Sequence, residues 1–312
     1  MNKIKILAVV GPTGGGKSAL ALELAKKLNG EIISCDSMQL YRRMNIGTAK
    51  PTASEQSEVP HHMIDIVEPC ESFSSADYVD MASRAIEDCA KRGKLPIVCG
   101  GTGLYLDALL RNADPEPDTT DESVRRELYS FYEENGADAL WQMLFDADPE
   151  SAAAIHKNNV KRVIRAIEVF RVSGVPKSEL DRRSKEGGDR YDACVIGLRY
   201  SDREVLYGRI NRRVDAMIAE GLVEETRSLM AEGVFEHNST AAQAIGYKEL
   251  FPYIEGREAL AESSERLKTA TRRYAKRQMT WFGAKSYVNW IDADKKTFEE
   301  IVNIATELFK NR

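Results

Sequence analysis

Apolar and polar positions alternate in blocks along the first third of the chain. Short apolar runs at 4–10, 31–34 and 95–99 have the length and composition of buried strands. Between them, residues 18–28 and 75–92 repeat apolar side chains at helical spacing. Strands that alternate with amphipathic helices are typical of βαβ units, so this part of the chain predicts a parallel sheet between helices.

The pattern changes after the acidic, proline-bearing stretch at 114–118, which we interpret as a domain boundary. Residues 122–173 have a helical pattern throughout, and the polar, Gly- and Arg-rich residues 174–190 predict a loop or mobile segment. A further strand and three helices then close the chain, at 193–198, 203–229, 259–282 and 297–310. We therefore expect a core made of 1–114 and 192–312, with a helical insertion at 115–191.

Composition narrows the class of protein. The chain has 312 residues and a net charge of −5, so binding to a nucleic acid would have to come from local basic patches. No apolar run is long enough to span a membrane, and five cysteines without C-x-x-C spacing predict neither a disulfide framework nor a zinc site. These features predict a cytoplasmic protein without a membrane partner. For the pair His61-His62 we expect a structural turn rather than a metal site.

A glycine-rich loop follows the first predicted strand directly. Residues 11–18 read GPTGGGKS, which fits the phosphate-loop pattern G-x-x-x-x-G-K-[ST] between a strand and a helix. Glycines let backbone N–H groups surround a phosphate, the lysine adds charge, and the last hydroxyl can bind Mg²⁺. We therefore expect a phosphate site made of Gly11, Pro12, Thr13, Gly14, Gly15, Gly16, Lys17 and Ser18. The fold predicted is α/β, with a P-loop-type parallel sheet core flanked by helices and an all-helical insertion domain.

Two other loops are expected at the same edge of the sheet. Asp36 closes the second strand, where a carboxylate can bind Mg²⁺ or accept a proton, or can simply cap the following turn. The strand at 95–99 lacks the carboxylate that often follows such strands, and it leads into the glycine-rich turn Gly100–Gly103. Asp36 is therefore the candidate acid–base group.

Basic residues gather in three places. Arg209 and Arg213 are four residues apart on one predicted helix, where they could neutralise an anionic leaving group or pair with nearby acids. Residues 271–282 mix cations, amides and rings, a composition that suits RNA, although a solvated helix face has the same pattern. In that stretch we single out Arg273, Lys276, Arg277, Gln278 and Trp281. A second patch in the insertion contains Lys161, Arg162 and Arg165.

Taken together, the motifs resemble those of the bacterial tRNA dimethylallyltransferases, also called tRNA isopentenyl transferases. The resemblance is carried in order by GPTGGGKS at 11–18, DSMQLY at 36–41, NIGTAKP at 45–51, PHH at 60–62, GGTGLY at 100–105, VKRVIRAIE at 160–168, GYKE at 246–249 and AKRQMTW at 275–281. Unlike some eukaryotic relatives, the chain has no C-terminal cysteines for a zinc finger.

The resemblance implies a reaction. A dimethylallyl group would pass from dimethylallyl diphosphate to the exocyclic amine of the adenosine 3′ of the tRNA anticodon, with Mg²⁺ as cofactor bound at Ser18. Asp36 would deprotonate the amine, and Lys17 and Arg209 would stabilise the departing diphosphate. The adenine would have to leave its stack to reach the site.

The resemblance also implies a tRNA interface with the anticodon stem-loop, reached partly by the insertion. The residues that we expect there are Asp36, Ser37, Met38, Gln39, Thr102, Lys161, Arg162, Val163, Ile164, Arg165, Gln243, Gly246, Tyr247, Lys248, Arg273, Lys276, Arg277, Gln278 and Trp281. We expect a monomer. Two alternatives stay open: a small-molecule or nucleotide kinase whose loop holds ATP, and a non-catalytic RNA-binding protein with a vestigial loop.

Overall fold

The structure is a computed structural model that describes residues 3–111, 119–237 and 239–312. The chain divides into two compact units, one formed by Met1–Leu110 with Tyr191–Arg312 and the other by Arg111–Arg190. The sequence pattern predicted the corresponding boundaries at 114/115 and 191/192. The acidic stretch at 114–118, which suggested the first of them, lies outside the described residues.

The first unit is built on a six-stranded sheet in which every described pair of strands is parallel. The strand order is β3-β2-β4-β1-β5-β6. The strands are β1 Lys5–Val10, β2 Gly30–Ser34, β3 His61–His62, β4 Leu95–Cys99, β5 Asp192–Arg199 and β6 Val288–Asp292. This arrangement confirms the predicted parallel α/β core.

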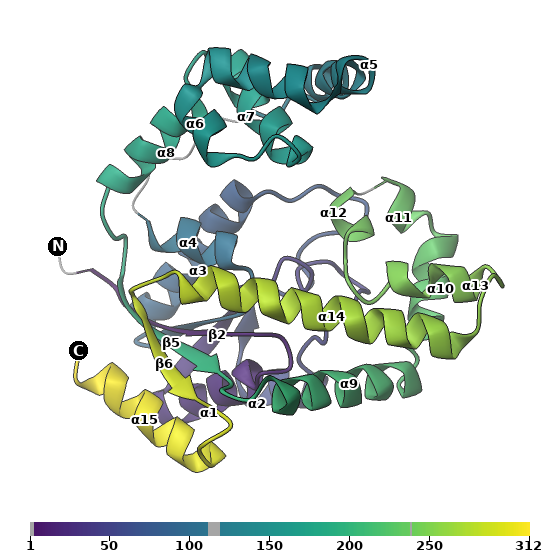
Figure 1. Cartoon of the computed structure of the whole chain (residues 1–312). Helices are drawn as coiled ribbons and strands as arrows, with labels where there is room; N and C mark the ends of the chain where they lie inside the picture. Colours follow the sequence, from purple (N-terminus) through teal and green to yellow (C-terminus); the bar gives the residue numbers. More distant parts are fainter. Residues whose placement is uncertain (1–2, 112–118, 238) are drawn as a thin grey trace. The chain divides into compact units, whose positions relative to one another are not determined.

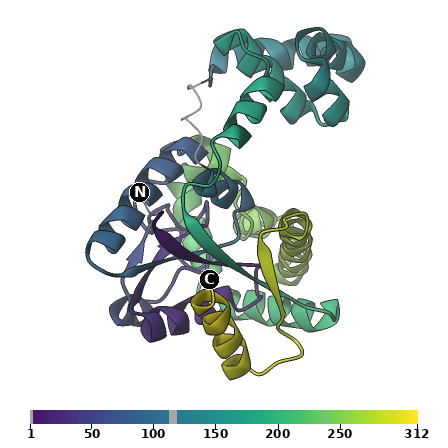
Figure 2. The same cartoon turned by 90° about the vertical axis from the view of Figure 1, so that its left-hand side faces the viewer.

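The two faces of the sheet are covered by different helices. In β1, Leu7 and Val9 face one core with helices α1 (Lys17–Leu28) and α15 (Phe298–Lys310). Ile6, Ala8 and Val10 face the other core, because side chains alternate along a strand. That face is covered by α3 (Ser75–Lys91), α4 (Gly103–Leu110) and α14 (Leu260–Gly283), as Figures 1 and 2 show.

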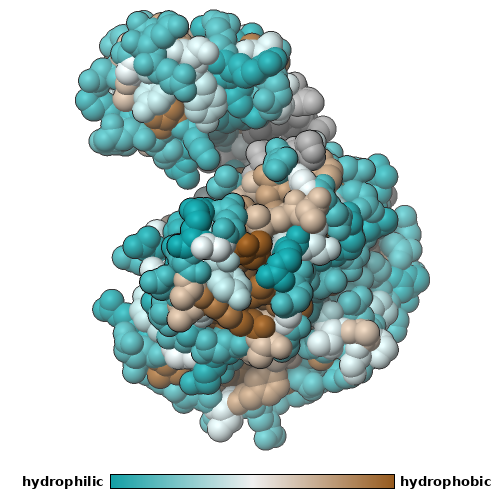
Figure 3. Space-filling model, turned by 90° about the vertical axis from the view of Figure 1, so that its right-hand side faces the viewer, coloured by the Kyte–Doolittle hydropathy of each residue, from teal (hydrophilic) through white to brown (hydrophobic). Residues whose placement is uncertain are grey.

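The first unit contains further helices, some of which pack against α14. They are α2 Ala53–Glu58, α9 Arg203–Ala219, α10 Leu222–Ala231, α11 Val234–His237, α12 Ser239–Ala242, the short 3₁₀ turn η1 Lys248–Leu250 and α13 Phe251–Ile254. Apolar side chains gather on the surface seen from the side of α10, α11 and α13 (Figure 3). Phe235, Phe251 and Ile254 are among the half-buried residues that pack there against the core.

The second unit is helical, with α5 Glu122–Ala147, α6 Pro149–Ala154, α7 Val160–Ser173 and α8 Lys177–Glu186. Its core is formed by Leu128, Leu140, Leu144, Val163 and Ile167. The loop predicted for 174–190 is wrong over α8. Pro176 precedes that helix, and ion pairs from Lys177 to Asp181 and from Arg183 to Glu179 stabilise its polar surface.

The turn predicted at His61-His62 is also wrong, because both residues form β3 at the sheet edge. No helix in the described residues is both long enough and apolar enough to cross a membrane.

Candidate active site

The phosphate loop joins β1 to α1 and needs glycine at three positions. Gly11, Gly14 and Gly16 have φ angles of 138°, 73° and 89°, which other residues rarely adopt. A Cβ at Gly14 would lie 2.9 Å from the Ile210 side chain on α9. The loop is therefore fixed by its own backbone and by α9 behind it.

Lys17 is the first residue of α1 and lies against the loop. Its Nζ donates a hydrogen bond to the Pro12 carbonyl at 2.8 Å. Desolvation of this ammonium group lowers its pKa from 10.5 to about 8, with Arg213 contributing and Cys99 and Asp36 opposing. An anion bound in the loop would restore the charged form, so the lysine is adapted to a phosphate.

Helix α9 places arginines beside the loop. Arg209 Nε donates to the Gly14 carbonyl at 2.8 Å, and the Tyr200 hydroxyl donates to the Gly15 carbonyl at 3.2 Å. A cavity of about 280 Å³ lies there, lined by residues 14–19 together with Arg209, Arg212 and Arg213. The cluster of cations around loop amides is suited to a di-anionic or larger phosphate group.

Arg213 was predicted only as a partner of Arg209 and was not assigned a site role. It is half-buried, and among the described residues no group accepts a hydrogen bond from it or pairs with it. Burial lowers its pKa, with Arg209 contributing and Asp36 opposing the shift. A half-buried guanidinium without a partner indicates an anionic ligand. The spacing of four residues from Arg209 was the signal in the sequence.

Asp36 follows β2 and lies near the same arginine. Its Oδ1 accepts the Met38 backbone N–H at 2.9 Å, and the next residue, Ser37, donates its N–H to Thr102 Oγ1 at 3.0 Å. Oδ2 has no partner among the described residues. The carboxylate therefore caps a turn with one oxygen and leaves the other available to a ligand.

A larger cavity of about 350 Å³ begins at Asp36. Its polar wall includes Thr13, Asp36 and Arg213, and its apolar wall is formed by Ile210, Val214, Met217, Ile245 and Leu267. Arg213 lines this cavity as well as the phosphate cavity. The two adjoining spaces can hold a ligand with an anionic head and an apolar body.

A family model described as IPP transferase matches residues 39–285, and one described as Isopentenyl transferase matches residues 4–69. The chain belongs to the IPP transferase family. This confirms the resemblance seen in the motifs.

Solved and curated relatives agree. A tRNA dimethylallyltransferase of Geobacillus thermodenitrificans is 51% identical over 92% of this chain and 90% of its own. The structure of a tRNA isopentenylpyrophosphate transferase from Bacillus halodurans has 45% identity and a TM-score of 0.72, covering 99% of this chain and 98% of that one. A eukaryotic dimethylallyltransferase acting on tRNA has 32% identity and a TM-score of 0.83, covering 99% and 80%.

In this IPP transferase, Gln278 and Trp281 pack inward from α14 beside the two glycine-rich turns. Gln278 is buried: its Oε1 accepts the Thr13 N–H at 2.8 Å, and its Nε2 donates to the Gly101 carbonyl at 3.0 Å. The Trp281 ring packs on the core, where a Cβ at Gly103 would lie 2.2 Å from it. Both residues join α14 to the glycine loops, and their contact with tRNA bases stays a prediction.

Three other residues expected at the tRNA interface have buried side chains. Val163 and Ile164 belong to the core of the helical unit. Tyr247 is fully buried and donates its hydroxyl hydrogen to Glu225 at 2.8 Å. Helical periodicity places Val163 and Ile164 on the inner face of α7, and Tyr247 packs against Gly47 outside any helix.

Other expected interface residues line the larger cavity or hold its walls. Ser37, Met38, Gln243, Gly246, Lys248 and Arg277 are part of the lining. Gln39 accepts a hydrogen bond from Ser34 Oγ at 2.8 Å and donates to the Thr48 and Ala49 carbonyls. Thr102 fixes the turn after Asp36, as described above.

The basic patches are partly free of protein partners. Arg273 and Lys276 are exposed on α14 and make no ion pair with any described residue, while Arg277 lies over the Tyr274 ring at 5.5 Å. Lys161 and Arg162 are exposed on α7. Arg165 instead pairs with the buried Glu168 and bonds to Thr119.

Two groups of residues have the chemistry of cation sites. Ser18 and Asp36 line the same small cavity beside Lys17, and hydroxyl and carboxylate oxygens suit Mg²⁺. Glu31, His62 and Cys89 also lie together, with ligand atoms within 4.8 Å of one another. There the Arg92 guanidinium binds both Glu31 oxygens, at 2.5 and 2.7 Å, and already supplies the positive charge.

Proposed function

We propose that this IPP transferase moves a dimethylallyl group from dimethylallyl diphosphate to the exocyclic amine of an adenosine in the tRNA anticodon loop. The names of the relatives reported above specify tRNA together with a dimethylallyl or isopentenyl group. The adenosine 3′ of the anticodon is the acceptor that the family motifs imply. The observation that carries the proposal is that Arg213 lines both the phosphate cavity and the cavity that begins at Asp36.

The donor would lie with its diphosphate in the phosphate loop. The loop amides, Lys17, Arg209 and Arg213 would hold the diphosphate oxygens, where charge grows as the carbon–oxygen bond breaks. The apolar dimethylallyl chain would point past Arg213 toward Ile210 and Val214. Cations fixed in this way favour the transition state, since the leaving group is more negative there than in the bound donor.

The acceptor amine would approach from the side of Asp36. As nitrogen bonds to the allylic carbon, the amine loses a proton to the free oxygen of Asp36, and diphosphate leaves with the electron pair of the broken bond. Because Met38 and Thr102 fix the turn, the carboxylate is oriented before the substrate arrives. The adenine must be extruded from the anticodon loop to reach this position.

Mg²⁺ fits the oxygen donors of this site. Ser18 would hold it, and when bound it would neutralise charge on the diphosphate. Lys17 and the arginines perform the same neutralisation from the protein side.

For the RNA, exposed cations on both units would contact phosphates. Arg273 and Lys276 on α14 and Lys161 and Arg162 on α7 are the candidates. A net-acidic chain with such local patches binds nucleic acid only where the patches lie. We also propose that the chain acts as a monomer in the cytoplasm, where the five cysteines would remain the free thiols seen here.

Mass analysis of tRNA tests the proposal. Unmodified tRNA with adenosine 3′ of the anticodon is incubated with dimethylallyl diphosphate and Mg²⁺, and a matched tRNA with guanosine there is the control. The adenosine tRNA should gain one dimethylallyl group and the control none. Transfer of phosphate from ATP to any acceptor, without prenyl transfer, would favour the kinase and overturn the proposal.

A further inference from the structure

Four donors converge on one carboxylate outside the catalytic cavity. Glu225 on α10 accepts the backbone N–H groups of Asn45, Ile46 and Gly47 at 3.0, 2.9 and 3.0 Å. The Tyr247 hydroxyl donates to the same side chain at 2.8 Å. Among the described residues Glu225 makes no ion pair. These four neutral donors are its direct hydrogen-bond partners, and the Lys50 charge acts on it from farther away.

The turn held in this way borders the acceptor side of the site. Gly47 and Thr48 line the cavity that also contains Asp36 and Arg213. Gly47 is pressed against Tyr247, since a Cβ added at this glycine would lie 2.5 Å from the ring. Its position is therefore set by two neighbours, the Glu225 carboxylate and the Tyr247 ring.

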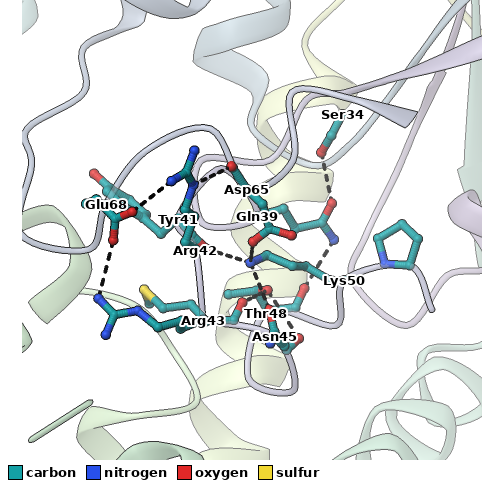
Figure 4. Close-up of polar contacts among 12 residues, drawn as sticks. Ser34, Gln39, Tyr41, Arg42, Arg43, Asn45, Thr48, Lys50, Asp65 and Glu68 are labelled. Atoms are coloured by element: carbon teal, nitrogen blue, oxygen red, sulfur yellow. Dashed lines mark hydrogen bonds and ion pairs between the residues drawn. The ribbon is translucent and has the colours of Figure 1, made fainter. Parts of the chain in front are cut away.

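A second anchor holds the same segment from its other end. The buried Lys50 donates to Tyr41 and Asp65 at 2.5 Å and to Asn45 Oδ1 at 3.0 Å (Figure 4). Figure 4 also shows Gln39 bridging from Ser34 to the backbone at Thr48. Lys50 and Gln39 hold the loop from within. Glu225 links the loop to helix α10, and an ion pair from Arg43 to Glu232 joins it to the end of that helix.

We propose that Glu225 is a positioning residue for the acceptor: by holding Asn45–Gly47 it fixes the wall against which the extruded adenine lies beside Asp36. This inference rests on the proposed function. Glu225 touches no reacting atom. It acts through Gly47 and Thr48, which shape the cavity.

The chemistry requires a carboxylate at this position. Both oxygens are in use: Oε2 serves Asn45 and Ile46, and Oε1 serves Gly47 and Tyr247. An amide of the same shape has one acceptor oxygen and would aim its NH₂ at two donors. Glu225→Gln should therefore release part of the turn, because hydrogen bonds to a charged acceptor are among the stronger ones.

The experiment measures prenyl transfer and amide exchange in the full chain, well below the unfolding temperature. In Glu225→Gln we expect kcat at saturating tRNA to fall about tenfold or more, since a small misplacement of a substrate is costly. KM for tRNA should change little because its phosphate contacts lie elsewhere, and affinity for inorganic diphosphate should be unchanged. Glu225→Asp keeps the charge and should recover part of kcat.

Glu224→Gln is the matched control. Glu224 precedes Glu225 on the same helix and is largely exposed. Its one ion pair with a described residue is with Arg227 at 3.9 Å. Its variant should keep kcat, KM and the exchange pattern of the unmodified protein.

Hydrogen exchange separates this inference from the proposed function. The amides of 45–47 should exchange about tenfold faster in Glu225→Gln than in the unmodified chain, whatever reaction the enzyme catalyses. If the unmodified chain transfers no prenyl group, the proposed function fails, and exchange still decides the role of Glu225. Unchanged exchange, or unchanged kcat in an active enzyme, would overturn the inference.

A second variant tests the role of Glu225 if Glu225→Gln does not fold. Tyr247→Phe removes one of the four donors and keeps the ring against Gly47, so it should fold and lower kcat by about two- to fivefold. If Glu225→Gln does not fold and Tyr247→Phe has an unchanged kcat and unchanged exchange at 45–47, the inference is overturned.

Discussion

Thr13 in the phosphate loop donates its backbone N–H to Gln278 Oε1 at 2.8 Å, across a sequence separation of 265 residues. The same amide side chain donates to the Gly101 carbonyl, so one residue of α14 links both glycine-rich turns. The segment at 271–282, whose composition suits RNA binding, thus also holds the phosphate loop in place through Gln278.

Gln278→Leu should therefore weaken the donor site. Without the amide, the Thr13 N–H and the Gly101 carbonyl lose their hydrogen-bond partners, and the phosphate loop is no longer tied to α14. We expect the dissociation constant for dimethylallyl diphosphate to rise about tenfold in a calorimetric titration. Thr280→Ala, an exposed position on the same helix, should leave it unchanged. Donor affinity that survives Gln278→Leu would contradict this role.

Donor affinity should depend on pH through Lys17. Desolvation lowers the pKa of this residue from 10.5 to about 8, so the free protein carries the charge below pH 8 and loses it above. Affinity for dimethylallyl diphosphate should be constant below that pH and fall by up to tenfold per pH unit above it. Lys17→Arg, which stays charged, should move this decline to higher pH. A flat profile from pH 7 to pH 10 would argue against the assignment.

Asp36→Asn separates the two roles of this carboxylate. Asparagine keeps an oxygen for the Met38 N–H, so the turn should persist, while the proton acceptor is lost. Turnover in a single-turnover assay should fall about 10²-fold or more, and donor binding should change less. Asp36→Ala removes both roles and should be at least as slow. Near-normal turnover in Asp36→Asn would remove general-base catalysis from the mechanism.

The salt dependence of tRNA binding tests the exposed face of α14. Arg273→Ala or Lys276→Ala should weaken binding and make the log-affinity versus log-salt slope shallower by roughly 0.7–0.9 for each phosphate that the variant no longer neutralises. Lys310→Ala is the control, because that exposed lysine ends α15 on the opposite face of the sheet. If both α14 variants keep the slope of the unmodified chain, this face is only solvated and the RNA binds elsewhere.

Stability at low pH should depend on Glu31. The Arg92 guanidinium holds the pKa of this buried carboxyl at about 2, well below 4.5. A lowered carboxyl pKa stabilises the fold above pH 4.5, and the contribution disappears as pH falls from 4.5 to 2. Because Arg92 is 42% exposed, we expect Glu31→Gln to lower the free energy of unfolding by about 2 kcal/mol at pH 7.

Denaturant titrations at pH 7 and pH 2.5 measure this difference, which should be much smaller at the lower pH. Glu87→Gln is the control, since its exposed carboxylate meets only Lys91 at 4.0 Å on the same helix. An equal loss of stability at both pH values would show that the effect of Glu31 is packing rather than charge.

β3 and β6 were not predicted, but local patterns in the sequence were sufficient to predict the other four strands, the phosphate loop and the position of Asp36. These depend on near neighbours: an apolar run, a glycine turn and a helix start within twenty residues. The burial of Gln278, Trp281 and Tyr247 could not be predicted in this way. Each contacts a segment far away in the sequence, and a mixed run of cations, amides and rings has the same composition whichever face is turned inward.

The role of Arg213 could not be predicted from local patterns either. Its spacing from Arg209 was visible, but its lack of a partner among the described residues depends on how α9 packs beside the phosphate loop. The helix α8 was missed because its polar residues carry no apolar periodicity.

The register of β1 has a consequence for synthesis on the ribosome. Strand β1 pairs with β5 over Lys5–Val10 and Asp192–Gly197. The first strand to be synthesised therefore cannot complete its pairing until almost two hundred further residues have been made. At roughly 5–20 residues per second, that delay is about 10–40 s. During it, an apolar segment that ends up buried on both faces lacks one of its two partners. Until β5 has been synthesised, we therefore expect chaperones that bind exposed apolar segments to bind β1 of the nascent chain.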